Sequence, residues 1–147
     1  MRYADVLAIW LKELGYTHCF FVAGGGIMHL LDAVRTRMTC VPVVHEVAAG
    51  IATEYFNEVS SSGLAFALVT AGPGVTNILT AMAGAYLESR QLLVLAGQVK
   101  SADLATGGIR QRGQPTFLAR QGILQRTRGP AGRCVPPKLA RRTLSSR

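Results

Sequence analysis

Apolar residues recur along this chain with two alternating spacings, one typical of helices and one typical of strands. In the first stretch, from Tyr3 to Leu14, they lie three and four positions apart, and Gly15 follows where a helix would end. Short continuous runs of branched and aromatic residues separate the helical stretches, as in buried strands. The pattern predicts helices at 3–14, 27–37, 46–58 and about 73–87, and strands at 18–23, 41–44, 64–70 and 91–96.

This alternation predicts the fold class. Strands that are apolar along their whole length and alternate with helices form a parallel sheet with helices on both faces. Right-handed crossovers make that a doubly wound α/β layer, which we expect to be incomplete at the C-terminal end of this chain. Because ligands of such sheets bind beyond the carboxyl ends of the strands, we expect loops 24–26, 45–46 and 72–74 to meet there.

Charge divides the chain into two parts. The 147 residues carry a net charge of +8, yet residues 1–113 hold eight basic residues and all eight acidic ones. Residues 114–147 hold the other eight basic residues, without sustained periodicity. We therefore predict an ordered, neutral body at 1–113 and a basic, disordered tail at 114–147. The tail has one aromatic residue, Phe117, and no recognisable recognition motif, which disfavours a nucleic-acid partner.

Composition also bears on compartment and metal binding. No apolar run approaches the roughly 18 residues that a membrane helix needs, and the first residues lack the pattern of a signal peptide. The three cysteines, Cys19, Cys40 and Cys134, are odd in number and form no CxxC pair, which disfavours a disulfide framework or a zinc site. We expect a cytoplasmic protein that has no membrane contact and no metal ligands of its own.

Gly24, Gly25 and Gly26 stand between a predicted strand and a predicted helix. That is the context of a dinucleotide-binding loop, but His29 occupies the position where the fingerprint needs a small residue, so a nicotinamide-binding domain is disfavoured. A tight turn between strand and helix is the structural interpretation of the three glycines. Close approach of the backbone to a ligand is the functional one.

Two other strand ends carry candidate chemistry. Glu46 opens a predicted helix, where a carboxylate favours the positive end of the helix dipole. The same carboxyl, partly withdrawn from water, could exchange protons near neutral pH. His45 beside it is either a general acid or base or a structural histidine. Pro73, between Gly72 and Gly74, suits a helix start and also a backbone surface pressed against a ligand or a second subunit.

In this order, these segments resemble the N-terminal, pyrimidine-binding domain of thiamine-diphosphate-dependent enzymes, and within them the acetolactate synthase group. The resemblance covers about residues 1–113. It is carried by Phe21-Val22-Ala23-Gly24-Gly25-Gly26-Ile27-Met28, Val44-His45-Glu46-Val47-Ala48-Ala49-Gly50, Val69-Thr70-Ala71-Gly72-Pro73-Gly74-Val75-Thr76-Asn77 and Ala96-Gly97-Gln98-Val99.

The resemblance implies roles for five residues. Glu46 would be catalytic, because in that family the glutamate hydrogen-bonds the aminopyrimidine ring of thiamine diphosphate and so promotes loss of the thiazolium proton. Pro73 and Asn77 would line the aminopyrimidine pocket, and the backbone of Gly25 and Gly26 would lie near the reacting centre. The substrate would be a 2-oxo acid that loses carbon dioxide, with the cofactor as electron sink.

This sequence lacks several features of the family that it resembles. Family members hold the diphosphate and its magnesium ion through a Gly-Asp-Gly motif in a C-terminal domain, and some bind FAD in a central domain. The motif is absent here, and the sequence is too short to hold those domains. Whether the parent enzyme binds FAD is therefore left undecided. Arg90-Gln91 replaces the usual proline, and the family pattern is lost near Gly113. A change of reading frame there would explain the loss, and a natural basic tail is the alternative.

We therefore expect half of a thiamine diphosphate site, in a fragment that is inactive alone. Such domains dimerise through the faces that carry the cofactor loops. The chain would accordingly form a homo-oligomer or pair with a full-length homologue. A non-catalytic interaction module that pairs with such a homologue is the alternative function.

Overall fold

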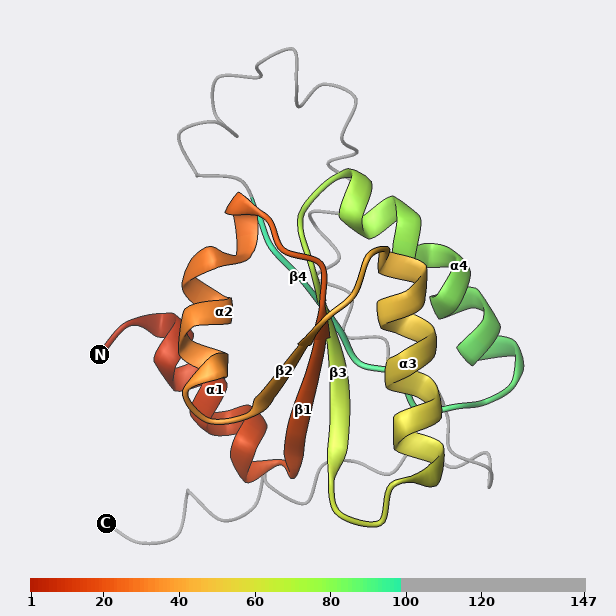
Figure 1. Cartoon of the computed structure of the whole chain (residues 1–147), viewed down its shortest axis with the longest axis horizontal. Helices are drawn as coiled ribbons and strands as arrows, with labels where there is room; N and C mark the ends of the chain where they lie inside the picture. The colour runs from red at the N-terminus through yellow and green to blue at the C-terminus, as the bar shows by residue number, and fades with distance from the viewer. Residues whose placement is uncertain (99–147) are drawn as a thin grey trace, which may run out of the picture.

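The computed structural model describes residues 1–98, which form one parallel sheet between two pairs of helices (Figure 1). The predicted boundary at residue 113 and the predicted tail lie outside the described residues. In chain order the elements are α1 (Tyr3–Glu13), β1 (Tyr16–Phe21), the 3-10 turn η1 (Gly25–Ile27), α2 (Met28–Arg35), β2 (Thr39–Pro42), α3 (Glu46–Val59), β3 (Leu64–Val69), α4 (Pro73–Leu87) and β4 (Val94–Ala96).

The four strands lie in the order β2-β1-β3-β4, and every neighbouring pair is parallel. Because every neighbouring pair is parallel, all four carboxyl ends lie at one edge of the sheet. Helices α2, α3 and α4 begin at this edge, which is uppermost in Figure 1. The predicted α/β class, with helices on both faces of a parallel sheet, is confirmed.

Strand β3 is apolar throughout because both of its faces are covered by helices. Side chains alternate between the two faces of a strand. Phe66 and Leu68 join the core beneath α1 and α2, whereas Ala67 and Val69 join the core beneath α3 and α4. Both faces of β3 are therefore dry, and its last five residues are all buried.

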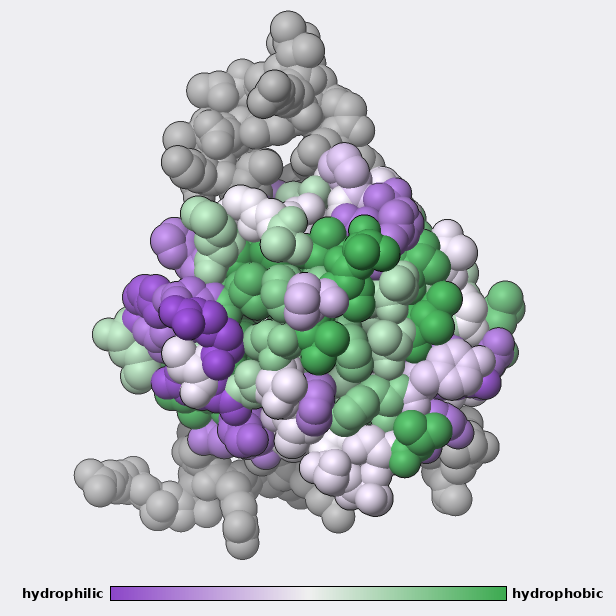
Figure 2. Space-filling view, in the orientation of Figure 1, coloured by the Kyte–Doolittle hydropathy of each residue, from purple (hydrophilic) through white to green (hydrophobic). Residues whose placement is uncertain are grey.

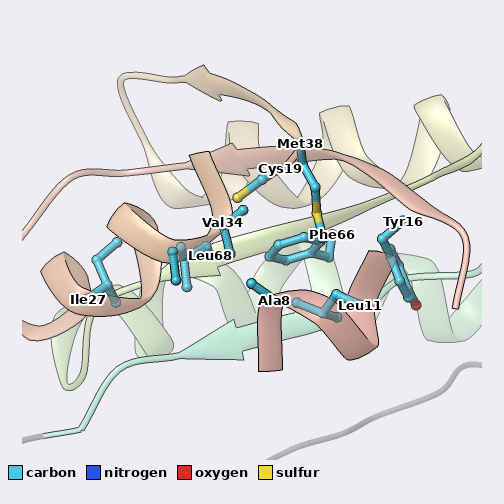
Figure 3. Packing of buried hydrophobic residues seen from close by; sticks show 10 residues of the cluster. Ala8, Leu11, Tyr16, Cys19, Ile27, Val34, Met38, Phe66 and Leu68 are labelled. Atoms are coloured by element: carbon cyan, nitrogen blue, oxygen red, sulfur yellow. The ribbon is translucent and has the colours of Figure 1, made fainter. Parts of the chain in front are cut away.

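The core under α1 and α2 is centred on the ring of Phe66. This ring meets Tyr16 edge to face, with 5.7 Å between the ring centroids. Leu11 of α1 and Met38, which precedes β2, belong to the same cluster (Figure 3). Because β3 is a central strand, this packing fixes α1 and α2 against the middle of the sheet.

Strand boundaries differ from the predicted ones where pairing, and not hydrophobicity, sets them. Strand β1 begins two residues early because Tyr16 pairs with Leu64 of β3. Strand β2 spans 39–42 and not 41–44, because His18 of β1 pairs with Thr39. Val44 is consequently not in a strand and is 98% exposed. A polar residue such as Thr39 gives no apolar signal, although its backbone pairs as well as any other.

The surface over α1 and α2 is charged. Arg2 pairs with Asp5 and with Asp32, at 2.9 Å and 3.0 Å, and Asp32 also pairs with Arg35 at 2.9 Å. Figure 2 shows hydrophilic surface gathered on the left of the molecule and apolar surface over its centre. Within residues 1–98, no helix is long and apolar enough to cross a membrane.

Candidate functional site

The glycine loop after β1 packs against the loops that follow β3 and β4. A Cβ atom built on Gly24 would lie 2.3 Å from Cγ2 of Thr70, and one built on Gly26 would lie 3.9 Å from the Ala71 nitrogen. A Cβ atom on Gly97 would lie 2.4 Å from the Gly26 carbonyl oxygen. The contacts at Gly24 and Gly97 leave no room for a side chain, so glycine at these two positions lets three strand ends converge.

Thr70 is the residue around which this edge is built, and sequence reasoning assigned it no role. Its side chain faces Gly24 on one side and Gly74 on the other, where an added Cβ would lie 2.7 Å from Thr70 Oγ1. Gly72 has a φ of 67°, a left-handed conformation that glycine adopts without strain. Pro73 then starts α4 with its fixed φ. The Gly-Pro-Gly sequence thus makes an abrupt turn around Thr70.

Glu46 is the one acidic side chain at the start of α3, and it is only 9% exposed. The Nδ2 group of Asn77 donates a hydrogen bond of 3.0 Å to its Oε2 atom. No other hydrogen bond or ion pair reaches the Glu46 carboxyl from residues 1–98, so Oε1 has no partner within the described part. A carboxyl group withdrawn from water needs hydrogen-bond partners for both oxygens, so Oε1 is the candidate position for a ligand or a water molecule.

Close packing of α3 on α4 places these two side chains together. A Cβ atom built on Gly50 of α3 would lie 2.4 Å from the Ala81 Cβ and 3.3 Å from Ile78 Cγ1 of α4. Gly50 and Glu46 are one helical turn apart, as are Ala81 and Asn77. The contact at Gly50 therefore sets the distance between the helices, and the pair Glu46–Asn77 lies one turn above it.

His45 has a structural role at the start of α3. It is the N-cap of α3, and its Nδ1 atom accepts a hydrogen bond of 3.2 Å from the Val47 nitrogen. This bond satisfies one of the amide groups that a helix start leaves without a partner. His45 is exposed, and its capping nitrogen is engaged.

The predicted site residues fall into two groups. Glu46 and Asn77 are in direct contact. Gly25, Gly26 and Pro73 are exposed at the same edge of the sheet and form no hydrogen bond with Glu46. The expected meeting of loops is seen between the glycine loop and Thr70, and between the first turns of α3 and α4.

The opposite end of α3 carries a second buried carboxylate. Arg90 Nη1 lies 3.0 Å from Glu54 Oε1, and the guanidinium also lies over the Tyr55 ring, 4.4 Å from its centroid. Asn57 binds the neighbouring backbone, with Nδ2 donating to the Gln91 and Ala65 carbonyls at 3.0 Å and 3.1 Å. Arg90-Gln91, which departs from the pattern of the resembled family, thus ties α3 to the loop before β4.

Comparison with known proteins identifies a family. The family model described as thiamine pyrophosphate enzyme, N-terminal TPP binding domain, matches residues 1–119. The acetolactate synthase large subunit of Buchnera aphidicola subsp. Acyrthosiphon pisum is 35% identical over 102 residues, which are 67% of this chain and 18% of that protein.

Two further relatives carry the same description, acetolactate synthase large subunit. The Lactococcus lactis subsp. lactis protein is 39% identical over 90 residues, which are 60% of this chain and 16% of that protein. The Corynebacterium glutamicum protein is 32% identical over 113 residues, which are 76% of this chain and 18% of that protein. The chain thus spans less than a fifth of the length of these relatives.

Proposed function

Because the chain belongs to the thiamine pyrophosphate enzymes, as the N-terminal TPP-binding domain of an acetolactate synthase-like enzyme, we propose that it forms the aminopyrimidine-binding half of a thiamine diphosphate site. The whole enzyme would act on 2-oxo acids. The observation that carries the proposal is the buried Glu46 carboxyl, whose Oε2 is held by Asn77 and whose Oε1 has no partner among residues 1–98.

The residues present fit this cofactor. An aminopyrimidine ring has acceptor ring nitrogens and a donor amino group. Glu46 Oε1, which lacks a partner in the described part of the chain, could accept from the amino group or, when protonated, donate to a ring nitrogen. The exposed backbone of Gly25 and Gly26 lets a flat ring approach without meeting a side chain. When bound, thiamine diphosphate supplies the electron sink that cleavage of a 2-oxo acid requires.

The chain's own residues would then do three things. Glu46 would hold a proton at Oε1 and share it with the bound ring, since a carboxyl that is kept from water is suited to proton transfer. Asn77 would keep the carboxyl in place through Oε2. Pro73 and the glycine loop would border the ring. We propose that magnesium and the diphosphate group are held by residues that this sequence does not supply.

An apolar surface on α3 and α4 supports a second protein as partner. Ile51, Tyr55 and Val59 follow one another at helical spacing on α3 and are 45%, 50% and 79% exposed. On α4, Leu79 and Tyr86 lie seven positions apart and Leu87 follows directly, and they are 39%, 62% and 81% exposed. We propose that this surface pairs with another copy of the chain or with a full-length homologue that completes the site.

A titration of the 147-residue chain with thiamine diphosphate and Mg²⁺, followed by amide NMR shifts, tests the proposal. We expect weak binding, with shifts concentrated in residues 24–26, around residue 46 and in residues 73–77. Glu46→Ala should abolish these shifts. Glu58→Ala, at an exposed glutamate of the same helix, should leave them intact. Shifts that are spread elsewhere, or that survive Glu46→Ala, would contradict a half-site at this edge.

The alternative, a non-catalytic module, shares the apolar surface but not the cofactor. Co-purification with a full-length homologue distinguishes the two when it is repeated with Glu46→Ala. If the turnover of the co-purified complex changes when the chain carries Glu46→Ala, the two proteins share an active site. If the complex forms and its turnover is the same with and without Glu46→Ala, the chain acts as a non-catalytic module.

A further inference from the structure

The contact between Glu46 and Asn77 gives the asparagine a task of its own. We propose that Asn77 is a positioning residue, which holds the Glu46 carboxyl in one orientation so that Oε1 is the oxygen presented to a ligand. The proposal rests on the proposed function only for the identity of that ligand. The orientation itself is a property of this chain.

The chemistry of the two groups fixes which atoms face each other. A carboxylate can only accept hydrogen bonds, so the asparagine must turn Nδ2 and not its carbonyl oxygen toward Glu46. The terminal torsion of a glutamate has broad, two-fold preferences, and its two oxygens exchange places easily in water. A donor at 3.0 Å from Oε2 removes that freedom in a carboxyl that is 9% exposed.

The packing of α3 against α4 fixes the contact between Glu46 and Asn77. Gly50 and Ala81 bring α3 and α4 so close that no added side-chain carbon fits between them. Glu46 and Asn77 lie one turn from Gly50 and Ala81, respectively, toward the start of each helix. Neither helix can slide along the other without moving the Gly50–Ala81 contact, so the distance between the two functional side chains is fixed by the core.

The electrostatic surroundings make the contact testable. Helix α4 contains no charged residue, and Glu46 is the only acid in the first turn of α3. The neighbouring titratable group is His45, whose Nδ1 accepts from the Val47 nitrogen. Asn77→Asp has nearly the same shape as the native residue but replaces the donor with an oxygen. Two carboxyl groups at hydrogen-bond distance cannot both ionise without strong repulsion.

Urea unfolding of the 147-residue chain at pH 5 and pH 8 tests the proposal. Thr80→Asp, at an exposed position of α4, is the control for a new charge on this helix. Between pH 5 and pH 8 the unfolding constant of Asn77→Asp should rise about tenfold more than that of Thr80→Asp, the effect of a rise of about two units in the folded pKa of the shared titration. Asn77→Ala should show no such added pH dependence.

Equal pH dependence of Asn77→Asp and Thr80→Asp would overturn the proposal, because it would mean that Asn77 does not face the carboxyl. The outcome is independent of cofactor binding. If thiamine diphosphate causes no NMR shifts but Asn77→Asp shows the added pH dependence, the proposed function fails and the positioning role stands. If binding occurs and the pH dependence is absent, the positioning role fails alone.

Discussion

Gly50 of α3 and Ala81 of α4 are so close that a Cβ atom on the glycine would lie 2.4 Å from that of the alanine. Atoms at this separation overlap, so the two helices are too close to accept another carbon atom at residue 50. Thr53, which follows Gly50 in the same helix, is fully buried and donates its hydroxyl to the Ala49 carbonyl at 2.7 Å. The interface between α3 and α4 is therefore dry and intolerant of added volume.

Gly50→Ala should destabilise the protein by about 1–3 kcal/mol, because the new methyl group forces the helices apart. Gly84→Ala, in α4, is the matched control, since a Cβ atom there would meet nothing within 4 Å. That control should stabilise the protein by about 0.5–1 kcal/mol through the higher helix propensity of alanine. Urea denaturation of both variants measures the difference. A Gly50→Ala variant as stable as the parent would contradict the close packing.

Arg90→Gln should destabilise the protein at pH 7 by more than the loss of an exposed ion pair does, because it leaves the buried Glu54 carboxylate without this cation. The double variant with Glu54→Gln should recover much of that loss, since a neutral amide tolerates burial better than an unpaired charge. Arg35→Gln, at an exposed arginine, is the control and should cost about 0–1 kcal/mol. Thermal or urea unfolding of the parent, of the Arg90→Gln and Glu54→Gln single variants and of the double variant gives the coupling. Additive losses would show that Arg90 and Glu54 do not depend on each other.

Glu46→Gln should slow exchange of the cofactor's thiazolium proton by orders of magnitude in a full-length enzyme that carries this domain. The amide is similar in size and can still hydrogen-bond, so affinity for thiamine diphosphate should fall only modestly. It cannot take up and return a proton as the carboxyl does. Hydrogen–deuterium exchange followed by NMR measures the rate. Unchanged exchange would remove Glu46 from the proton transfer.

The purified 147-residue chain, free of homologues, should release no carbon dioxide from pyruvate when thiamine diphosphate and Mg²⁺ are added. Its sequence has no Gly-Asp-Gly motif to anchor the diphosphate. Without that anchor the thiazolium ring is not held beside Glu46, and proximity of that kind is worth about 7–11 kcal/mol of barrier in well-oriented systems. Cofactor-dependent release of carbon dioxide above the rate of a Glu46→Ala control would contradict this expectation.

Acid should weaken the contact between α1 and α2. Hydrogen bonds from Arg2 lower the pKa of Asp5, and those from Arg35 and then Arg2 lower the pKa of Asp32. A carboxyl with a lower pKa in the folded chain stabilises it above the unfolded pKa of about 4, and this contribution is lost as the pH falls. Between pH 6 and pH 3 the melting temperature of Asp32→Asn should therefore fall less than that of the parent.

Glu13→Gln, which removes an exposed acid outside this network, serves as its control and should follow the parent. The difference should shrink in 1 M salt, because the Asp32 ion pairs are exposed. A parent and an Asp32→Asn variant with the same acid dependence would show that these ion pairs do not stabilise the fold.

The sequence predicted those parts of the fold in which one residue type carries the signal. The start of α3 at Glu46 was predicted, and its end at Val59 differs by one residue, because its apolar pattern is regular and Ser60 to Gly63 breaks it. The predicted bounds of strand β2 were two residues too late, because its position depends on pairing with β1, which no local pattern records. The Gly-Pro-Gly turn was predicted from the φ preferences of glycine and proline.

The candidate site was predicted in its members but not in its contacts. Glu46 stands out because an acid opens a helix, yet its bond to Asn77 joins residues 31 positions apart. Thr70 was missed because a threonine at a strand end has no special signal. The small size of Gly24 and Gly74, which both face it, was the one available clue. The sequence marked Arg90 only as a departure from the family pattern. Its ion pair with Glu54 forms only because α3 packs beside the loop before β4.

Helix α3 runs from one edge of the sheet to the other, and its 14 residues rise about 20 Å. Its far end leads into the exposed serines Ser61 and Ser62, whereas Glu46 stands at its beginning. A fluorescent dye attached at Ser61, or a purification tag inserted between the two serines, would thus sit a whole helix length from the candidate site. That position offers a place to immobilise the protein on a sensor chip with the ligand-facing edge directed into solution.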